Sequence, residues 1–506
     1  MSVPSVLNTN YENESQDLTI ETDVLEPNVL NTAQAVFVIP KKGSVLDSKS
    51  ALKMRVNWEG YVEATESDLG GKLFSGLLGL IKNARLYASG QLISRLDQAG
   101  EKIHLDKQFD SQEFKEQYCD TKHGSNQGFY VANGRGQSGA NGAIINTDEN
   151  QGIRVGGDPT NMKHYFRGIG KSADKNGMEM FVMLDELFPM LKDLQLPVRF
   201  LKDEIRIEID WEQDKTKWLY NSGVTVTDYS TVVIDNVVMF LDYLTYNPEM
   251  DAELEETINS TGVTIPFRQT AVMTKVLPAN LVDDAVIKED VLIGQEGRAV
   301  MKIYVSKKYP NVVTGLTGNK NQTNVFQGVC RSERLKDQKF NFVVNDLLIY
   351  DRDVENNKES YSYFSYAGEK SATCYPEAWE QNDNYNALNV TTDILYTTND
   401  GNTADQRILG RTPCNGTDNT AGNQVKGFVK DGIKGSQNWD SVDLSKYGSS
   451  LQPQNAMRIG STPIIYRLQR TTMNNVREGG AVSLTIFVEY LRLFDIRGGD
   501  LAVRDL

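Results

Sequence analysis

The chain has little of the chemistry that enzymes and metal proteins carry. Its 506 residues include four widely spaced cysteines, with no CxxC pair, and only three histidines: His104, His123 and His164. The histidines lack an HExxH spacing and a cysteine partner, so we expect solvated or structural roles for them. No GxSxG, P-loop or EF-hand pattern occurs. The sequence therefore predicts no enzyme activity, no catalytic residues, no cofactor and no metal.

Long apolar runs and positive charge are also lacking. Charge or glycine interrupts each apolar stretch before 18 residues, which predicts no transmembrane helix. The first residues have no basic region followed by an apolar core, so we expect no signal peptide. The net charge of −15 disfavours a coat that neutralises nucleic-acid phosphates over its whole surface. The pairs Lys41-Lys42 and Lys307-Lys308 are too small to predict specific nucleic-acid binding.

One glycine motif resembles a nucleotide fingerprint. Gly134, Gly136 and Gly139 spell GxGxxG. A dinucleotide site needs these glycines between a buried strand and a helix that holds the pyrophosphate. Here more glycine follows instead of a helical pattern, so we interpret the motif as part of a loop.

Two pairs of adjacent carboxylates have a functional and a structural interpretation. Asp185 with Glu186, and Asp283 with Asp284, could act in acid/base catalysis or hold a cation. Helix capping and surface charge explain such pairs more simply. We therefore assign them no catalytic or metal-binding role.

What the chain does contain is a repeated strand. Residues 231–246 read TVVIDNVVMFLDYLTY, and residues 482–493 read VSLTIFVEYLRL. Aligned without a gap, Phe240 falls on Phe487 and Tyr243 on Tyr490. Both segments are β-branched and aromatic, without proline or glycine, which is typical of buried strands. We expect these aromatic side chains to pack in the sheets and not to form a ligand site.

Two further landmarks repeat in the same order. The alternating apolar residues Leu52, Met54 and Val56 can be aligned with a similar alternation in 298–309. Residues 83–96 predict a β-hairpin that turns at Ser89-Gly90, and residues 340–350 predict a second one that turns at Asn345-Asp346. Three landmarks at nearly one spacing indicate that a β-rich domain is duplicated.

These patterns divide the chain into four parts. We expect a flexible or partner-dependent arm over 1–31, because it has little apolar surface to bury. A first domain follows over 32–247, with a long polar loop at about 121–175. A capped acidic helix, 248–262, connects it to a second domain over 263–506, with a long loop at about 353–447. Short alternating strands and few helices predict an all-β fold of two tandem antiparallel jelly-roll sandwiches with about eight strands each.

Two segments add a resemblance to a known family. GLLGLIKNARLYASGQLISRLDQAG (76–100) and TIFVEYLRLFDIRGGDLAVRDL (485–506) are similar to segments of the double jelly-roll major capsid proteins of double-stranded DNA viruses, of the polinton-like virus and virophage type. The resemblance implies a homotrimeric, pseudo-hexameric capsomer that tiles an icosahedral virion with its neighbours. It also implies penton or other minor capsid partners, long loops on the outside, an arm inside the shell and assembly in the host cell.

Two alternatives remain open. A carbohydrate-binding or glycosidase-type β-sandwich would place exposed Trp and Tyr beside paired carboxylates, and Trp379 and Trp439 lie in the second long loop. A secreted adhesin or surface-layer protein would use similar sandwiches, but we would expect a signal peptide in it. Self-assembly separates the capsid hypothesis from both.

Overall fold

The computed structural model describes most of the chain outside the two long polar loops. The described residues are 18–62, 76–88, 90–108, 122–123, 136–138, 144–146, 170–171, 178–202, 204–213, 232–308, 335, 337–354, 397–399, 403–405, 439–445, 456–472 and 479–506. Most of the predicted loops 121–175 and 353–447 therefore lies outside the described residues, as do His164 and Trp379. Short strand pairs are described inside these loops: β8 (Gly136–Ser138) with β9 (Ile144–Asn146), and β19 (Thr397–Asn399) with β20 (Thr403–Asp405).

The first half of the chain folds into two facing sheets. Sheet A consists of β1 (Thr19–Leu25), β13 (Val232–Thr245), β5 (Ala51–Val62) and β11 (Met178–Met183), with the short β4 (Val45–Leu46) and β10 (Gly170–Lys171). Sheet B has the order β2 (Val29–Leu30), β3 (Gln34–Ile39), β12 (Ile205–Trp211), β6 (Ile81–Ala88) and β7 (Gln91–Asp97). The two sheets pack face to face because every second residue of β5 is apolar. Leu52, Met54 and Val56 point into the core and are fully buried.

The second half repeats this arrangement. Sheet C has the order β14 (Val263–Leu277), β24 (Val482–Arg497), β16 (Ala299–Lys308) and β21 (Asp440–Asp443), with β22 (Met457–Arg458) and β25 (Asp500–Asp505) at its edges. Sheet D has the order β15 (Val286–Gly294), β23 (Ile464–Thr471), β17 (Lys339–Val344) and β18 (Leu347–Leu348).

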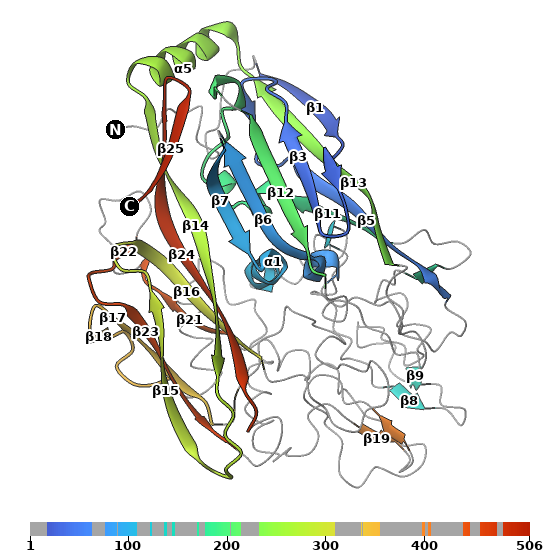
Figure 1. Cartoon of the computed structure of the whole chain (residues 1–506), viewed down its shortest axis with the longest axis vertical. Coiled ribbons are helices and arrows are strands. Elements are labelled where there is room, and N and C mark those ends of the chain that lie inside the picture. The colour runs from blue at the N-terminus through green and yellow to red at the C-terminus, as the bar shows by residue number, and fades with distance from the viewer. Residues whose placement is uncertain are drawn as a thin grey trace.

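Strand order matches between the halves in both sheets. Across sheet A, β1, β13, β5 and β11 occupy the positions that β14, β24, β16 and β21 occupy across sheet C. The row β3-β12-β6-β7 likewise corresponds to β15-β23-β17-β18. Four strands facing four in this order form a jelly roll, so the predicted double jelly roll is confirmed. Figure 1 shows the two sandwiches side by side.

The helices in the described part of the chain are short. They are α1 (Ala99–Gln108), α4 (Leu184–Leu187), α5 (Pro248–Ser260) and the 3-10 helices η2 (Gly76–Leu80), η5 (Pro189–Lys192) and η6 (Val198–Phe200). The helix α5 occupies the place predicted for the connector. The side chain of Asn247 caps it by accepting a hydrogen bond from the Met250 amide at 2.8 Å.

The long pair β14–β24 contributes to both hydrophobic cores. It is paired from Val263 opposite Ile496 to Leu277 opposite Val482. Its upper end packs into the core of the first sandwich through residues that include Phe267. Its lower end lines the core of the second sandwich. Figure 1 shows this pair running along both sandwiches, so the two halves share a strand pair.

The structure differs from the prediction in the N-terminal arm. Residues 1–17 lie outside the described part of the chain, but Thr19–Leu25 form β1, which pairs with β13 along its length. The backbone of β1 makes ladder hydrogen bonds while most of its side chains stay exposed. Because this pairing needs little apolar burial, composition did not reveal it. The tail over Asp500–Asp505 is also a strand, paired with β24.

Candidate functional site

The motif residues from the sequence do not converge on a catalytic centre in the described part of the chain. His104 is buried in α1, and Nε2 of His123 lies 3.1 Å from a carboxylate oxygen of Glu186. Asp185 pairs with Lys49 at 2.7 Å. Asp283 and Asp284 lie in a turn before β15. Within the described ranges no three His, Cys, Asp or Glu side chains are grouped as metal ligands would be.

Lys41, Lys42 and Trp439 also have structural surroundings within the fold. Lys41 donates to the backbone carbonyls of Leu201 and Lys202, and Lys42 pairs with Asp23. Trp439 is only 1% exposed, so it cannot stack on a sugar from solvent. Of the GxGxxG glycines, Gly136 begins a short strand and not a helix.

In the described part of the chain, the fold builds an extended polar and apolar contact between the two sandwiches. The helix α1 lies on the outer face of sheet C, and β7 and η5 lie against the edge strand β14 of the same sheet. Leu105 of α1 packs among three buried aromatic side chains: Tyr304, Trp439 and Phe487. Figure 1 shows α1 between the sandwiches, next to β24.

Charged side chains surround this apolar contact. Lys102 of α1 lies 2.7 Å from Glu489 of β24 and 2.5 Å from Asp106. Glu101 pairs with Lys308 of β16 at 2.7 Å. The pairs with Glu489 and Lys308 join elements that are more than 200 residues apart in sequence. Their partners satisfy charges that burial alone would make costly.

Burial and pairing shift the pKa values at this contact. Burial disfavours the charged form of Lys102, but Asp106 and Glu489 outweigh it and raise the pKa of Lys102 above its ordinary value. Its stabilising effect is therefore fully present below the ordinary value of 10.5 and is lost as the pH rises through the folded value. Burial also raises the pKa of the Glu101 carboxyl, although Lys308 and Ser306 oppose this.

The remaining contacts involve the edge of sheet C. Arg268 of β14 forms a bidentate ion pair with Asp193, the residue that follows η5. The distance from Nη2 of Arg268 to Oδ1 of Asp193 is 2.8 Å. Ser94 of β7 donates to the side-chain oxygen of Gln269 at 3.0 Å. Gln269 in turn donates to the backbone carbonyl of Arg95. The relative orientation of the two sandwiches is thus fixed by hydrogen bonds as well as by apolar packing.

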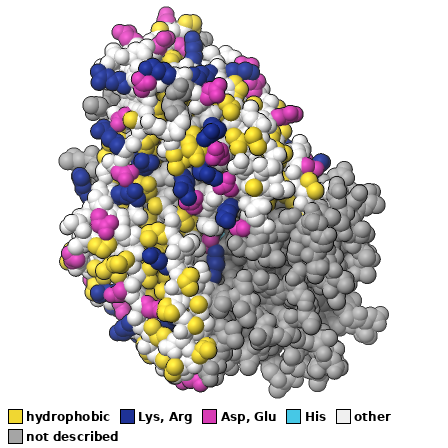
Figure 2. Space-filling model, viewed as in Figure 1, with side chains coloured by type: hydrophobic (Ala, Val, Ile, Leu, Met, Phe, Trp, Pro, Cys, Tyr) yellow, Lys and Arg dark blue, Asp and Glu magenta, His cyan; other side chains and the backbone are white. Residues whose placement is uncertain are grey.

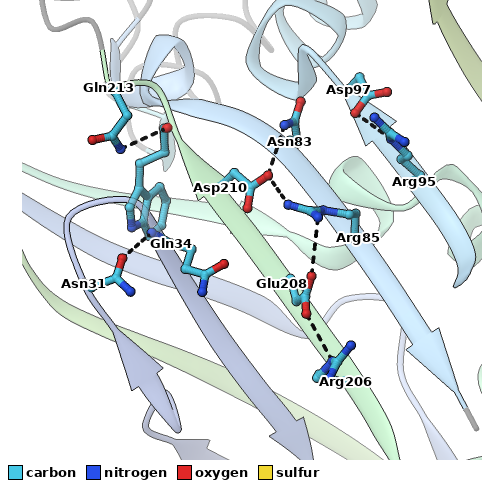
Figure 3. A network of polar contacts seen from close by, with 11 residues as sticks. Asn31, Gln34, Asn83, Arg85, Arg95, Asp97, Arg206, Glu208, Asp210 and Gln213 are labelled. Carbon is cyan, nitrogen blue, oxygen red and sulfur yellow. Dashed lines mark hydrogen bonds and ion pairs between the residues drawn. The ribbon is translucent and has the colours of Figure 1, made fainter. Parts of the chain in front are cut away.

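The outer face of sheet B has a different character, because its charges pair within one sandwich. Figure 3 shows Arg85 of β6 between Asp210 and Glu208 of β12, with Arg206 on the other side of Glu208. Asn83 also donates to Asp210 at 3.0 Å. These residues alternate with Ile205, Ile207 and Ile209, which point into the core. Such a face is compatible with water on its outer side.

Apolar side chains are exposed elsewhere on the surface. In the second sandwich they gather at β15 and the turn before it: Leu281, Val282, Val286 and Leu292. Figure 2 shows hydrophobic side chains over the lower part of the molecule, where β15 and β23 lie. In the first sandwich they include Ile20 and Val24 of β1. Exposed apolar side chains that gather in this way are typical of surfaces that bind other proteins.

Comparison with solved structures supports the fold, whereas the comparisons of sequence found no match. No protein-family model matches the chain, and no curated protein matches its sequence. A chain of the Sputnik virophage structure solved by cryo-EM aligns with a TM-score of 0.55 and 12% identity, over 98% of this chain and 91% of that chain. PBCV-1 VP54, fitted into a reconstruction of the virophage Sputnik, aligns with a TM-score of 0.51 and 9% identity over 98% of each chain. A chain of the PBCV-1 capsid aligns with a TM-score of 0.50 and 10% identity over 98% of each. At these identities the likeness shows a shared fold.

Proposed function

We propose that this double jelly-roll chain is a viral major capsid protein, a structural subunit whose copies associate into homotrimeric, pseudo-hexameric capsomers that tile an icosahedral shell. The observation that carries the proposal is the alignment of 98% of the chain with chains from the Sputnik and PBCV-1 structures. The aligned residues thus include both sandwiches and the connector between them.

The architecture supports this role physically. A shell subunit needs a rigid body with large lateral surfaces, and the buried charge pairs around α1 hold the two sandwiches in one orientation. It also needs apolar surface for its partners, and both sandwiches expose aliphatic side chains. Interfaces of obligate assemblies are large and apolar.

Further parts of the proposal follow from this role. The N-terminal arm, predicted over 1–31, would contact the shell interior, and the loops 121–175 and 353–447 would face outward. Penton or other minor capsid proteins would complete the shell, which would assemble inside the host cell. No helix in the described ranges has the length and apolarity needed to cross a membrane.

The carbohydrate-binding alternative has less support. It relied on exposed tryptophans, and Trp439 is buried against Phe487 with ring centroids 6.3 Å apart. Trp379 lies outside the described residues.

Assembly of the purified chain tests the proposal. We expect a particle of three times 56.6 kDa by light scattering after gel filtration, and hexagonal arrays or shells by negative-stain electron microscopy as salt is varied. A chain that stays monomeric at every salt concentration and hydrolyses a glycan would contradict the proposal.

A further inference from the structure

A cavity with basic side chains in its lining lies at one end of the first sandwich. Its volume is about 1080 Å³, and it is formed by the end of β3, the start of β12 and the turn between β6 and β7. The charged and ring-bearing side chains of its lining are Lys41, Lys202, Arg206, Glu204, Tyr87 and Pro40. A concave site of this size with several convergent polar groups is typical of a binding site.

The ammonium group of Lys41 is held in position but keeps part of its binding capacity. It donates to the backbone carbonyls of Leu201 and Lys202, at 2.7 and 2.6 Å. A lysine ammonium group has three N–H donors, so these carbonyls occupy two of them. Lys41 is exposed, and among the described residues no carboxylate pairs with it. A fixed cation with a remaining donor is suited to bind a carboxylate through a charge-assisted hydrogen bond.

The other two cations of the cavity have partners that a ligand can replace or supplement. Nζ of Lys202 lies 2.7 Å from Asp500, and the two side chains are 56% and 74% exposed. Such an exposed ion pair contributes little free energy, so Lys202 can exchange Asp500 for another carboxylate. Arg206 lies over the ring of Tyr87, 4.6 Å from its centroid, and its Nε lies 3.2 Å from Glu208 (Figure 3). The guanidinium group has further N–H donors beyond Nε.

The strand β1 begins close to this cavity. Its first residue, Thr19, lies opposite Thr245, the last residue of β13. Asp23 of β1 forms an ion pair with Lys42, the residue next to Lys41 of the cavity. Four residues of strand separate Asp23 from Thr19, which corresponds to about 14 Å. The chain that precedes β1 therefore starts within a short distance of the three cations.

The charge of the preceding segment is complementary to that of the cavity. Residues 1–17 include three carboxylates, Glu12, Glu14 and Asp17, and no lysine or arginine. Extended chain of this length spans up to about 60 Å, which is more than enough to reach the cavity. Because the segment is tethered beside the cavity, its effective concentration there is in the millimolar range. Weak charge contacts are therefore sufficient to hold it.

We propose that the acidic segment 11–17 binds in the cavity lined by Lys41, Lys202 and Arg206 of its own chain. Its carboxylates take the remaining donor of Lys41 and replace or supplement the exposed partners of the other two cations. The occupant is this segment because it carries the opposite charge and is tethered at the same end of the sandwich. The inference goes beyond the proposed function and does not depend on it, since it concerns a contact within one chain.

Cross-linking of the full-length chain with a carbodiimide tests the contact directly. This reagent joins a carboxylate to an amine without a spacer, so it links only groups that touch, and mass spectrometry of the peptides identifies each pair. We expect a carboxylate of residues 11–17 to be linked to Lys41 or Lys202. The ion pair between Asp23 and Lys42 is the internal positive control, because its groups are in contact in the structure.

Digestion with a protease that cuts after glutamate measures how much of the segment is bound. We expect cleavage after Glu12 and Glu14 to be about fivefold faster in Lys41→Gln than in the wild type, the upper range for loss of one exposed charge contact. The control is Lys288→Gln on β15 of the second sandwich, which should leave the cleavage rate unchanged. Both lysines are exposed, so neither substitution should affect folding.

A mixture of isotope-labelled and unlabelled chains identifies the occupant. Links confined to chains of one label support the assignment, whereas links between labelled and unlabelled chains would show that the cavity binds the segment of a second copy and would overturn it. The assignment is also wrong if Asp23 and Lys42 are linked but residues 11–17 are not, or if Lys41→Gln is cleaved no faster than the wild type. The mass of the particle in solution, measured separately, decides the proposed function, which these failures leave unchanged.

Discussion

At the scale of single residues, the sequence does not reveal which charged side chains of the second sandwich are buried, because residues with different surroundings are adjacent in the chain. Lys307 and Lys308 look like one basic surface pair, but adjacent residues of β16 point to opposite sides of sheet C. Lys308 faces the first sandwich and pairs with Glu101. Lys307 and Asp440 are fully buried and lie 2.6 Å apart.

Further hydrogen bonds complete this buried pair. Gln338 donates to Asp440 at 2.7 Å, and the Tyr466 hydroxyl donates to its other oxygen at 2.5 Å. Burial, followed by the charge of Asp440, raises the pKa of Tyr466 well above its ordinary value, so this hydroxyl keeps its proton. Such a pair is costly to break from one side, because the remaining charge stays in the core.

Lys307→Met tests this cost. We expect the free energy of unfolding to fall by about 3–5 kcal/mol, because Asp440 loses its cation while remaining buried. Urea unfolding followed by circular dichroism measures the change. Lys288→Met on the exposed side of β15 is the control, and it should change stability by less than about 0.5 kcal/mol. Equal losses in both variants would show that the buried pair contributes nothing specific.

At the scale of elements, the two hairpins were predictable because their turns carry local chemistry. Gly90 has a φ of 71°, which glycine adopts at little cost. In the second hairpin Asn345 and Asp346 have φ values of 51° and 64°, as a two-residue hairpin turn requires. The two residues differ in their contacts. The Asn345 side chain accepts from the Gly460 amide at 2.8 Å and donates to the Arg458 carbonyl at 3.2 Å.

Glycine substitutions in this turn should therefore have opposite effects. Asp346→Gly relieves a left-handed backbone and should raise the free energy of unfolding by about 0.5 kcal/mol. Asn345→Gly gains the same relief but loses two hydrogen bonds, and should lower it by about 1 kcal/mol. Thermal unfolding of the two variants beside the wild type gives both signs. A gain in both would mean that the Asn345 contacts to 458 and 460 do not stabilise the turn.

At the scale of the whole molecule, the shared strand pair and the α1 contact couple the two sandwiches. The core of the first sandwich includes Phe267 and Phe494 from the second half, with ring centroids 6.4 Å apart. At the other end of the contact, Leu105 inserts among Tyr304, Trp439 and Phe487. We therefore expect the wild-type chain to unfold in a single calorimetric transition.

Leu105→Asp tests the coupling. A charge placed among buried aromatic side chains without a partner costs several kcal/mol, which should weaken the contact between the sandwiches and split the transition in two. Leu105→Met keeps the volume and the apolar character, so it should leave one transition, with a loss below about 1.5 kcal/mol. Two transitions already present in the wild type, unchanged in Leu105→Asp, would show that the sandwiches are independent.

The sequence by itself determined the alternating strands, the two hairpins, the duplication and the double jelly roll, because each is set by alternation and turn residues over short distances. Leu52, Met54 and Val56 alternate with polar residues, and this alone places them in the core. The equivalence of 231–246 with 482–493 likewise follows from the sequence, and β13 and β24 do hold equivalent places.

Only the tertiary structure decided which surfaces meet. The polar segment 19–25 became a strand because its backbone pairs with β13, although its composition gave no sign of this. Lys102 and Glu489, and Glu101 and Lys308, are brought together by a contact between domains that no local pattern encodes. Local chemistry fixes the alternating strands, whereas the choice of partners between faces depends on the packed shape of the whole chain.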